Sequence, residues 1–257
     1  MSTITLAARD SSTMVRRQLR RLLRYPSMTV QLIITPVIIL LLFVYVLGGT
    51  LGAGLGGDRS AYVNYVVPGI LLMAVATAAT GTAVMVSSDM TEGIVARFRT
   101  MRISRASVLT GHVVGSVIQQ LLGMTVLIGI ALAIGFRPAA GILDWLAAAG
   151  LLTLFAVAVT WLAVALGLKA QTPEAASNAP MPLILLPFLG SGFVPTDSMP
   201  TALRWFAEYQ PFTPIMETVR GLLLGTPIGN SGGIAVAWCA GIAAVSYLWA
   251  KRTFDKA

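Results

Sequence analysis

Residues 87–108, SSDMTEGIVARFRTMRISRASV, are the stretch that decides the fold. They contain two acidic residues and four arginines, and they lie between two apolar runs that are each long enough to cross a bilayer. A short charged loop between two spans must lie on one face of the membrane, and loops rich in arginine stay on the cytoplasmic side. The stretch therefore predicts a cytoplasmic loop at residues 87–107, placed where it can dock a soluble partner.

The composition excludes a soluble globular domain. Of the 257 residues, 56% are hydrophobic and only 11% are charged, against about 25% charged in soluble domains. One membrane domain over residues 1–257 is expected. Segments predicted to face the cytoplasm hold 14 of the 18 Lys and Arg residues, and the outer side keeps Arg59, Arg137, Arg204 and Arg220. The net charge of +8 therefore follows the positive-inside pattern of a membrane protein and does not indicate nucleic-acid binding.

Six apolar segments have the length of transmembrane helices. They cover about residues 30–47, 63–86, 108–135, 145–168, 175–194 and 228–250. Six spans place both termini on one side, and the basic residues at both ends predict that this side is the cytoplasm of a cell-membrane protein. Pro180, Pro182 and Pro187 predict a kinked fifth span that packs on protein or faces a cavity. The alternative is that this span tolerates its prolines, as transmembrane helices can, and that they have no special role.

Residues 11–25 have the pattern of an amphipathic helix on the membrane surface. One arc is apolar, and the opposite arc consists of Arg16, Arg17, Arg20, Arg21 and Arg24. Arginines on this arc would lie among lipid phosphates. A solvated helix packed on protein is the alternative. A secretory signal fits less well, because the apolar run that follows is longer than a typical signal core and no cleavage site follows it.

Two loops on the outer side have different patterns. Residues 48–58, GGTLGAGLGGD, predict a flexible loop without regular structure. Residues 195–227 have intermediate hydrophobicity, and their apolar residues recur at helical spacing beside Arg204, Glu208, Glu217 and Arg220. This second pattern predicts two short helices that are half-buried at the outer face and re-enter the membrane.

The sequence contains no pattern for chemistry of its own. The predicted spans hold no Asp, Glu, Lys or Arg, and His112, near the cytoplasmic end of the third span, is expected to pack. Ion-coupled carriers usually keep a titratable group at mid-membrane. There is no phosphate-binding loop of the G-x-x-x-x-G-K-[ST] type, and one cysteine and one histidine form no metal-ligand spacing. The chain is therefore not expected to be an enzyme or to bind a metal or cofactor, and it needs an external energy source to move a cargo.

Three stretches, in this order, resemble the membrane subunit of ABC-2 type exporters, most closely the daunorubicin-resistance (drug-efflux) branch. The first is RRLLRYP with LIITPVI (residues 20–26 and 32–38). The second is PGI with DMTEGIVARFRTM (residues 68–70 and 89–101). The third is FLGSGFVP with QPFTPIMETVRGLLLG (residues 188–195 and 210–225). The chain departs from the family pattern at Arg102, where relatives usually have proline, and at Gln210, where they usually have asparagine.

The resemblance implies an all-α membrane protein of the type V ABC exporter kind, with an interfacial helix, six transmembrane helices and short helices in the last outer loop. It implies a transporter of two permeases, either copies or paralogues, and two ATPase subunits that bind ATP and Mg. Residues 92–100 would form the coupling helix, and the residues that contact the ATPase would be Glu92, Gly93, Arg97, Phe98, Arg99 and Arg102. A solvated charge cluster that only sets topology is the alternative for this loop.

The implied function is ATP-driven export of hydrophobic or amphiphilic drugs, or of lipid-like metabolites. Candidates for the cargo path are Phe43, Tyr45, Met73, Phe188 and Phe193, because aromatic and methionine surfaces suit flat amphiphilic molecules. Ordinary helix packing is the alternative for each of them. For the whole chain the alternatives are export of a polysaccharide or lipid-linked glycan, a membrane scaffold that transports nothing, and a secondary carrier.

Overall fold

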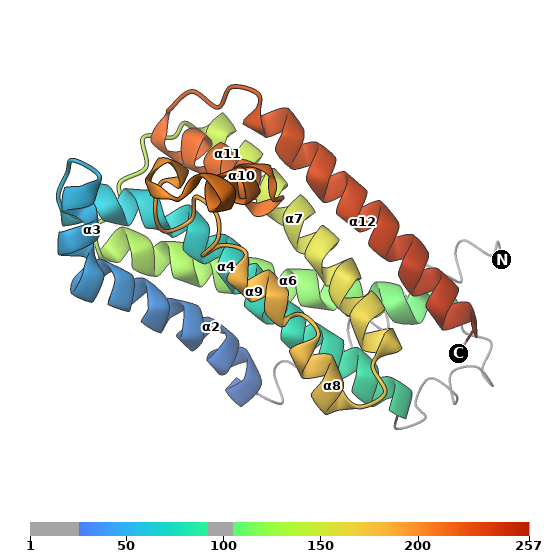
Figure 1. The fold of residues 1–257 in the computed structure, drawn as a ribbon. Coiled ribbons are helices and arrows are strands. Elements are labelled where there is room, and N and C mark those ends of the chain that lie inside the picture. The colour runs from blue at the N-terminus through green and yellow to red at the C-terminus, as the bar shows by residue number, and fades with distance from the viewer. Residues whose placement is uncertain (1–25, 92–104, 257) are drawn as a thin grey trace.

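The computed structural model describes residues 26–91 and 105–256, and every regular element in these ranges is helical (Figure 1). Five stretches of helix are long and apolar enough to cross a membrane: Ile33–Gly54, Arg59–Thr91, Leu109–Ala133, Ile142–Lys169 and Ser231–Phe254. They match five of the six spans expected from the sequence. The chain is therefore a multi-pass helical membrane protein.

Helix α4 (Arg59–Thr91) is the centre of the bundle. It contacts α2 (Pro26–Leu41), α6 (Arg105–Ala133), α7 (Ile142–Lys169) and α11 (Phe212–Leu224), and Figure 1 shows it running through the middle of the molecule. Small residues allow close packing: a Cβ on Gly167 of α7 would lie 2.5 Å from the carbonyl oxygen of Ala83. Helix α12 (Ser231–Lys256) packs along α7. With 33 residues, α4 is about 50 Å long, so its ends extend beyond a hydrocarbon core of about 30 Å.

The expectation of a flexible loop at residues 48–58 is wrong. Helix α2 continues through a π-helical turn (Leu42–Leu47) into α3 (Gly48–Gly54), and only the next four residues form a turn. A Cβ on Gly52 would overlap the carbonyl group of Asp58, and Gly56 has a φ of +73°. The glycines therefore allow the two ends of a tight turn to approach each other closely. Helix α3 ends immediately before this turn.

The kink expected in the fifth span, at residues 175–194, is larger than the sequence predicts. The chain forms α8 (Pro173–Asn178), α9 (Met181–Leu185) and then a series of turns. Pro180, Pro182 and Pro187 lack the amide hydrogens that a continuous helix needs, so the expected kink is a complete break. The segment still follows α4: α8 and α9 both contact α4, and the Tyr62 hydroxyl near the start of α4 donates to the carbonyl of Phe193 at 3.2 Å.

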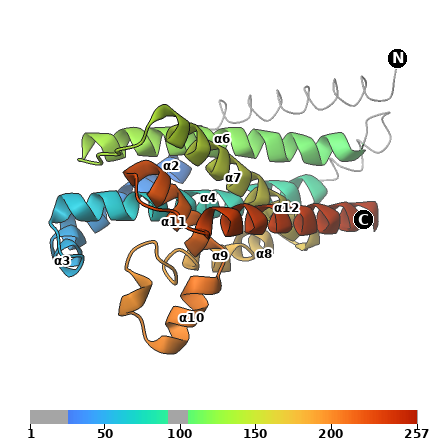
Figure 2. The ribbon, with the colours of Figure 1, turned by 90° about the horizontal axis from the view of Figure 1, so that it is seen from above.

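The two short helices expected within residues 195–227 are present, preceded by a 3₁₀ turn (Thr196–Ser198). Helix α11 is largely buried, as its amphipathic pattern predicts, and nine of its residues are buried. Helix α10 (Thr201–Tyr209) has only Ala207 buried and stands away from the bundle (Figure 2). Against protein, α10 therefore buries far less of its surface than α11 does, and its Trp205 is 66% exposed.

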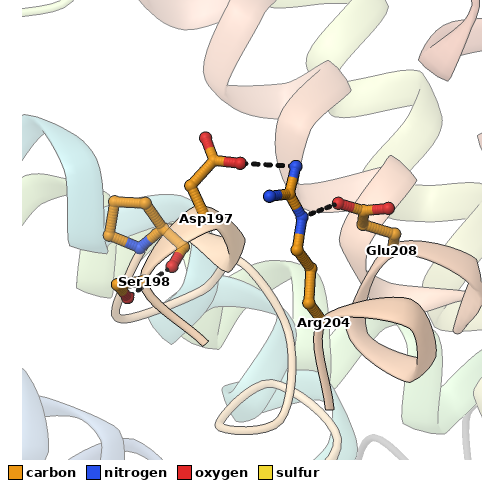
Figure 3. A network of polar contacts seen from close by, with 5 residues as sticks. Asp197, Ser198, Arg204 and Glu208 are labelled. Carbon is orange, nitrogen blue, oxygen red and sulfur yellow. Dashed lines mark hydrogen bonds and ion pairs between the residues drawn. The ribbon is translucent and has the colours of Figure 1, made fainter. Parts of the chain in front are cut away.

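A polar network ties α10 to the turn before it (Figure 3). Arg204 Nε donates to Glu208 Oε1 at 2.7 Å, and Arg204 Nη2 lies 2.6 Å from Asp197 Oδ1. The hydrogen bond to Glu208, together with the negative charges of Asp197 and Glu208, raises the pKa of Arg204 above its ordinary value. Both acidic groups are exposed or nearly so, so the network fixes local geometry and contributes little to global stability.

The arginines expected on the outer side gather at one end of the bundle. Arg59 begins α4, the backbone amide of Arg137 donates to Asn64 Oδ1 at 2.9 Å, and Arg220 contacts Tyr65. Lys169 belongs to the opposite end, where its Nζ lies 5.9 Å from the ring centroid of Trp249 near the end of α12. These four basic residues therefore divide between the two ends of the bundle as expected from the sequence.

Candidate functional site

Three of the five residues expected along the cargo path form one aromatic cluster: Phe43, Phe188 and Phe193. The rings of Phe188 and Phe193 are stacked, with centroids 4.4 Å apart and an interplanar angle of 8°. Phe43, in the π-helical turn, lies 4.5 Å from Phe193 and 6.3 Å from Phe188. Phe193 is buried, whereas Phe188 is 40% exposed. The cluster thus has a buried base and one ring open to the surroundings, a geometry that can stack against a flat apolar molecule.

The other two residues expected on the path lie elsewhere. Met73 is buried in the core of α4, with 1% of its surface exposed. Tyr45 is 53% exposed, and the guanidinium carbon of Arg59 lies 5.5 Å from its ring centroid. The structure therefore does not bring Met73 or Tyr45 into the aromatic cluster.

The start of α4 holds the turns that carry Phe188 and Phe193. Gly69 packs directly on Gly192, and a Cβ on Gly69 would lie 2.5 Å from the carbonyl oxygen of Gly192. The hydroxyls of Tyr62 and Tyr65 donate to the carbonyls of Phe193 and Ser191 at 3.2 and 2.9 Å. Because these carbonyls lie outside any regular helix, they need such donors when buried. The position of the aromatic cluster therefore depends on α4.

Arg220 of α11 fastens the same turns from the other side. Its Nη2 donates to the carbonyl of Ser191 at 2.6 Å, its Nε donates to the carbonyl of Tyr65 at 3.2 Å, and its guanidinium carbon lies 3.8 Å from the Tyr65 ring centroid. Burial lowers the pKa of Arg220 from its ordinary value, and the two hydrogen bonds with the ring contact compensate for lost hydration. Arg220 thus joins α11, α4 and the turns of the aromatic cluster.

Gln210 takes part in the same arrangement. Its Nε2 donates to the carbonyl of Leu186 at 3.3 Å and to Thr213 Oγ1 at 3.0 Å, and its Oε1 accepts from the amide of Phe212 at 3.1 Å. A shorter side chain such as asparagine reaches less far, so Gln210 is a length-sensitive contact between α11 and the turns after α9. From the sequence, Gln210 is a departure from the family pattern and Arg220 is an outer-side arginine, and neither contact could be predicted.

A second group of polar contacts, which the sequence analysis missed, joins α6 to its neighbours. His112, Ser116 and Gln120 follow one another at four-residue intervals along one face of α6. Ser116 Oγ accepts from Thr82 Oγ1 of α4, and Gln120 Nε2 donates to Thr160 Oγ1 of α7, each at 3.0 Å. Polar residues spaced four apart in an otherwise apolar helix are the sequence feature that could have predicted these contacts.

The third contact of this face corrects the expected boundary of the charged loop. Asp89 belongs to α4, is buried, and lies with Oδ2 3.2 Å from His112 Nε2. A carboxylate therefore does occur within α4, three residues beyond residue 86, where the second span was expected to end. His112 packs, as expected, but it does so through a polar pair.

The residues expected to contact the ATPase and the arginines of the surface helix lie outside the described residues. These are Glu92, Gly93, Arg97, Phe98, Arg99 and Arg102 in the loop, and Arg16, Arg17, Arg20, Arg21 and Arg24 near the start of the chain. Their roles stay predictions from the sequence.

The helical bundle, with five helices long and apolar enough to cross a bilayer among the described residues, defines a multi-pass membrane protein. The ABC-2 type transporter family model matches residues 10–224, so the chain belongs to that family. It is 27% identical over 223 residues to the daunorubicin resistance ABC transporter permease protein DrrB1 of Streptomyces coeruleorubidus, covering 86% of this chain and 77% of that protein. It is 25% identical over 216 residues to the probable doxorubicin resistance ABC transporter permease protein DrrC of Mycobacterium tuberculosis, covering 83% and 78%. The expected family and its drug-resistance branch are thus confirmed.

Proposed function

We propose that this chain is the permease subunit of an ATP-driven exporter that moves hydrophobic or amphiphilic molecules, such as drugs or lipid-like metabolites, out of the cell. The observation that carries the cargo class is the aromatic cluster, in which the exposed Phe188 ring is stacked on the buried Phe193. Such a surface binds flat apolar molecules by stacking and apolar contact. The relatives' names, which mention daunorubicin and doxorubicin resistance, favour the same class.

The energy would come from a partner. The sequence has no phosphate-binding loop, so ATP and Mg would bind to two ATPase subunits that dock on residues 92–100, in the loop after α4. Phe98 would fill an apolar pocket of the ATPase while Arg97 and Arg99 pair with its carboxylates. Closure of the two ATPases would then rock the bundle and open its outer end. A second permease, either a copy or a paralogue, would complete the complex.

We further propose six crossings in a cell membrane, with both termini in the cytoplasm. Gly167 near the end of α7 packs on Ala83 of α4, and the carbonyl of Phe193 is bonded to Tyr62 of α4. Residues 167–193 therefore pass along 21 residues of α4, about 31 Å at the rise of an α-helix, which is the thickness of the hydrocarbon core. A broken fifth crossing accounts for this path, and the carbonyls of Leu186, Ser191 and Phe193 accept hydrogen bonds inside the protein, as lipid requires.

The direct test is transport by the reconstituted complex. The chain would be purified with its ATPase, placed in liposomes, and supplied with ATP and daunorubicin as the first probe. We expect daunorubicin movement that needs ATP and hydrolysis that daunorubicin stimulates. Hydrolysis without movement of any apolar or amphiphilic probe from a panel would contradict the proposed cargo class. Failure to bind any ATPase would contradict the proposed complex.

A further inference from the structure

Two basic residues and a tryptophan meet near the ends of α7 and α12, which pack along each other (Figure 1). Lys169 is the last residue of α7, and its Nζ lies 5.9 Å from the ring centroid of Trp249 on α12. Arg252 follows Trp249 by three residues, so the two side chains are neighbours on the helix surface. Lys169 and Arg252 are exposed, and Trp249 is half-buried. We call these three residues the α7–α12 basic site.

The positive charge of the α7–α12 basic site is not neutralised by protein. Among the side chains that the structure describes, no carboxylate forms an ion pair with Lys169 or Arg252. This includes the exposed Glu174, which begins α8 five residues beyond Lys169. The C-terminal carbonyls of α7 carry about half a negative charge, which offsets only part of the two cations. The site is therefore suited to an anion.

The α7–α12 basic site lies at the level where a bilayer has its headgroups. Lys169 ends the apolar stretch Ile142–Lys169, and Trp249 and Arg252 lie in the last turns of Ser231–Phe254. Tryptophan is enriched at this boundary, and lysine and arginine near helix ends extend to the interface. The outer-side arginines lie at the other end of the bundle. The site thus belongs to the end proposed to face the cytoplasm, whose leaflet carries anionic lipids.

We propose that the α7–α12 basic site binds the phosphate headgroup of an anionic phospholipid, such as phosphatidylglycerol, from the cytoplasmic leaflet. The Arg252 guanidinium donates two N–H groups to phosphate oxygens, and the Lys169 ammonium adds a point charge. The Trp249 ring holds that ammonium by a cation–π contact. A lipid fits better than a soluble acidic partner because the ring lies at the depth of the headgroups. The inference goes beyond the proposed function, since it involves neither cargo nor ATP.

A third cation separates a defined site from general surface charge. Lys251 is exposed and adjacent to Arg252 in the chain. At about 100° per residue, however, Lys251 lies about 200° around α12 from Trp249, whereas Arg252 lies only about 60° away. Diffuse attraction to anionic lipid depends on the number of cations, so it would respond equally to the loss of Lys251 or Arg252. A defined site should respond to Arg252 and not to Lys251.

The test is photolabelling of the full chain in phosphatidylcholine nanodiscs. The probe is a trace of phosphatidylglycerol with a diazirine high on one acyl chain, and mass spectrometry quantifies label on chymotryptic peptides from the ends of α7 and α12. We expect ordinary phosphatidylglycerol to displace the probe, and phosphatidylethanolamine with the same acyl chains not to displace it. Glycerol phosphate in the buffer should also leave the label in place, because it lacks the acyl chains that bring the phosphate to this depth.

Lys169→Gln and Arg252→Gln should each weaken the binding of phosphatidylglycerol about fivefold, which corresponds to about 1 kcal/mol for one cation at an anionic surface. Lys251→Gln is the matched control and should leave the binding at the level of the parent. All three side chains are exposed, so the variants should fold, and equal unfolding temperatures would check it. Label on peptides from residues 11–25, whose arginines are unchanged, is the internal reference.

Equal weakening by Lys251→Gln and Arg252→Gln would overturn the proposal, because the attraction would then be diffuse. Unchanged binding in both Lys169→Gln and Arg252→Gln would overturn it too, as would equal displacement by phosphatidylethanolamine. Displacement by glycerol phosphate would assign the site to a soluble phosphate, and displacement by an added ATPase would assign it to a protein interface. Labelling proceeds without ATP, so a chain that binds phosphatidylglycerol here but exports nothing would refute only the proposed function.

Discussion

The guanidinium carbon of Arg220 lies 3.8 Å from the ring centroid of Tyr65, and Arg220 Nε donates to the carbonyl of the same tyrosine. One arginine of α11 therefore contacts both the side chain and the backbone of one residue of α4. Its Nη2 also holds the carbonyl of Ser191. Because the turns at Ser191 carry the aromatic cluster, this contact joins the stability of the bundle to the proposed cargo surface.

Arg220→Lys should lower the free energy of unfolding by about 2 kcal/mol, because lysine keeps the charge but loses the planar fork and the stacked contact. Thermal unfolding of the purified chain would measure it. Arg204→Lys is the control: Arg204 is an exposed arginine with two acidic partners, and its replacement should change little. Equal decreases in the free energy of unfolding for the two variants would show that the contact with Tyr65 contributes no extra stability.

Gly69→Ala should destabilise the chain by about 1–3 kcal/mol, because its Cβ would overlap the backbone of Gly192. Gly150→Ala is a matched change in α7 where a Cβ would meet nothing within 4 Å. There alanine should be neutral or stabilising, since it favours helix over glycine by roughly 1 kcal/mol. Unfolding of both variants in the same detergent decides the point, and a harmless Gly69→Ala would mean that the two backbones can separate.

Phe188→Ala should reduce stimulation of hydrolysis by an apolar probe while leaving the unfolding temperature nearly unchanged, because the ring is 40% exposed. Phe193→Ala removes a buried ring and should lower the free energy of unfolding by about 3 kcal/mol. Trp205→Ala on α10 removes an aromatic side chain that is 66% exposed and lies outside the cluster, so it serves as the control. If Phe188→Ala and Trp205→Ala respond alike to the probe, the cluster has no specific role.

The Asp89–His112 pair should be energetically coupled. Removing one partner of a buried pair costs about 3–5 kcal/mol, whereas removing both costs less than the sum. A double-mutant cycle with Asp89→Ala, His112→Ala and the double variant, measured by unfolding, should give a coupling of at least about 1 kcal/mol. Additive effects would mean that the 3.2 Å contact contributes nothing to stability.

Gly93→Pro and Phe98→Ala should uncouple ATP hydrolysis from export in the reconstituted complex. Proline lacks both the backbone freedom and the amide hydrogen of glycine, and alanine cannot fill an apolar pocket on the ATPase. Hydrolysis and export would be measured side by side, with Thr100→Ser as a mild control in the same loop. Parent-like coupling in both variants would remove this loop from its proposed role.

The prediction from sequence succeeded where the signal is local. Hydropathy over about 20 residues identified five of the spans, because a helix in lipid satisfies its own backbone and needs only an apolar surface. The helices of the last outer loop followed from the spacing of their apolar residues. The grouping of Phe43, Phe188 and Phe193 could not be derived in this way. Residues 43 and 193 are far apart in the chain. They meet because Tyr62, Tyr65 and Arg220 hold the turns that contain Ser191 and Phe193.

By itself, the sequence determined that this chain crosses a membrane repeatedly, which family it belongs to, and that its basic residues fall into two groups. The composition of the chain and the order of its motifs are sufficient to establish these three points. Only the tertiary structure decided that residues 48–54 are helical, that the fifth segment is broken, and that Asp89 is buried against His112. These outcomes depend on which partner each glycine, proline or polar group meets. Such partners are distant in sequence, and they come within hydrogen-bond or van der Waals distance only when the helices pack.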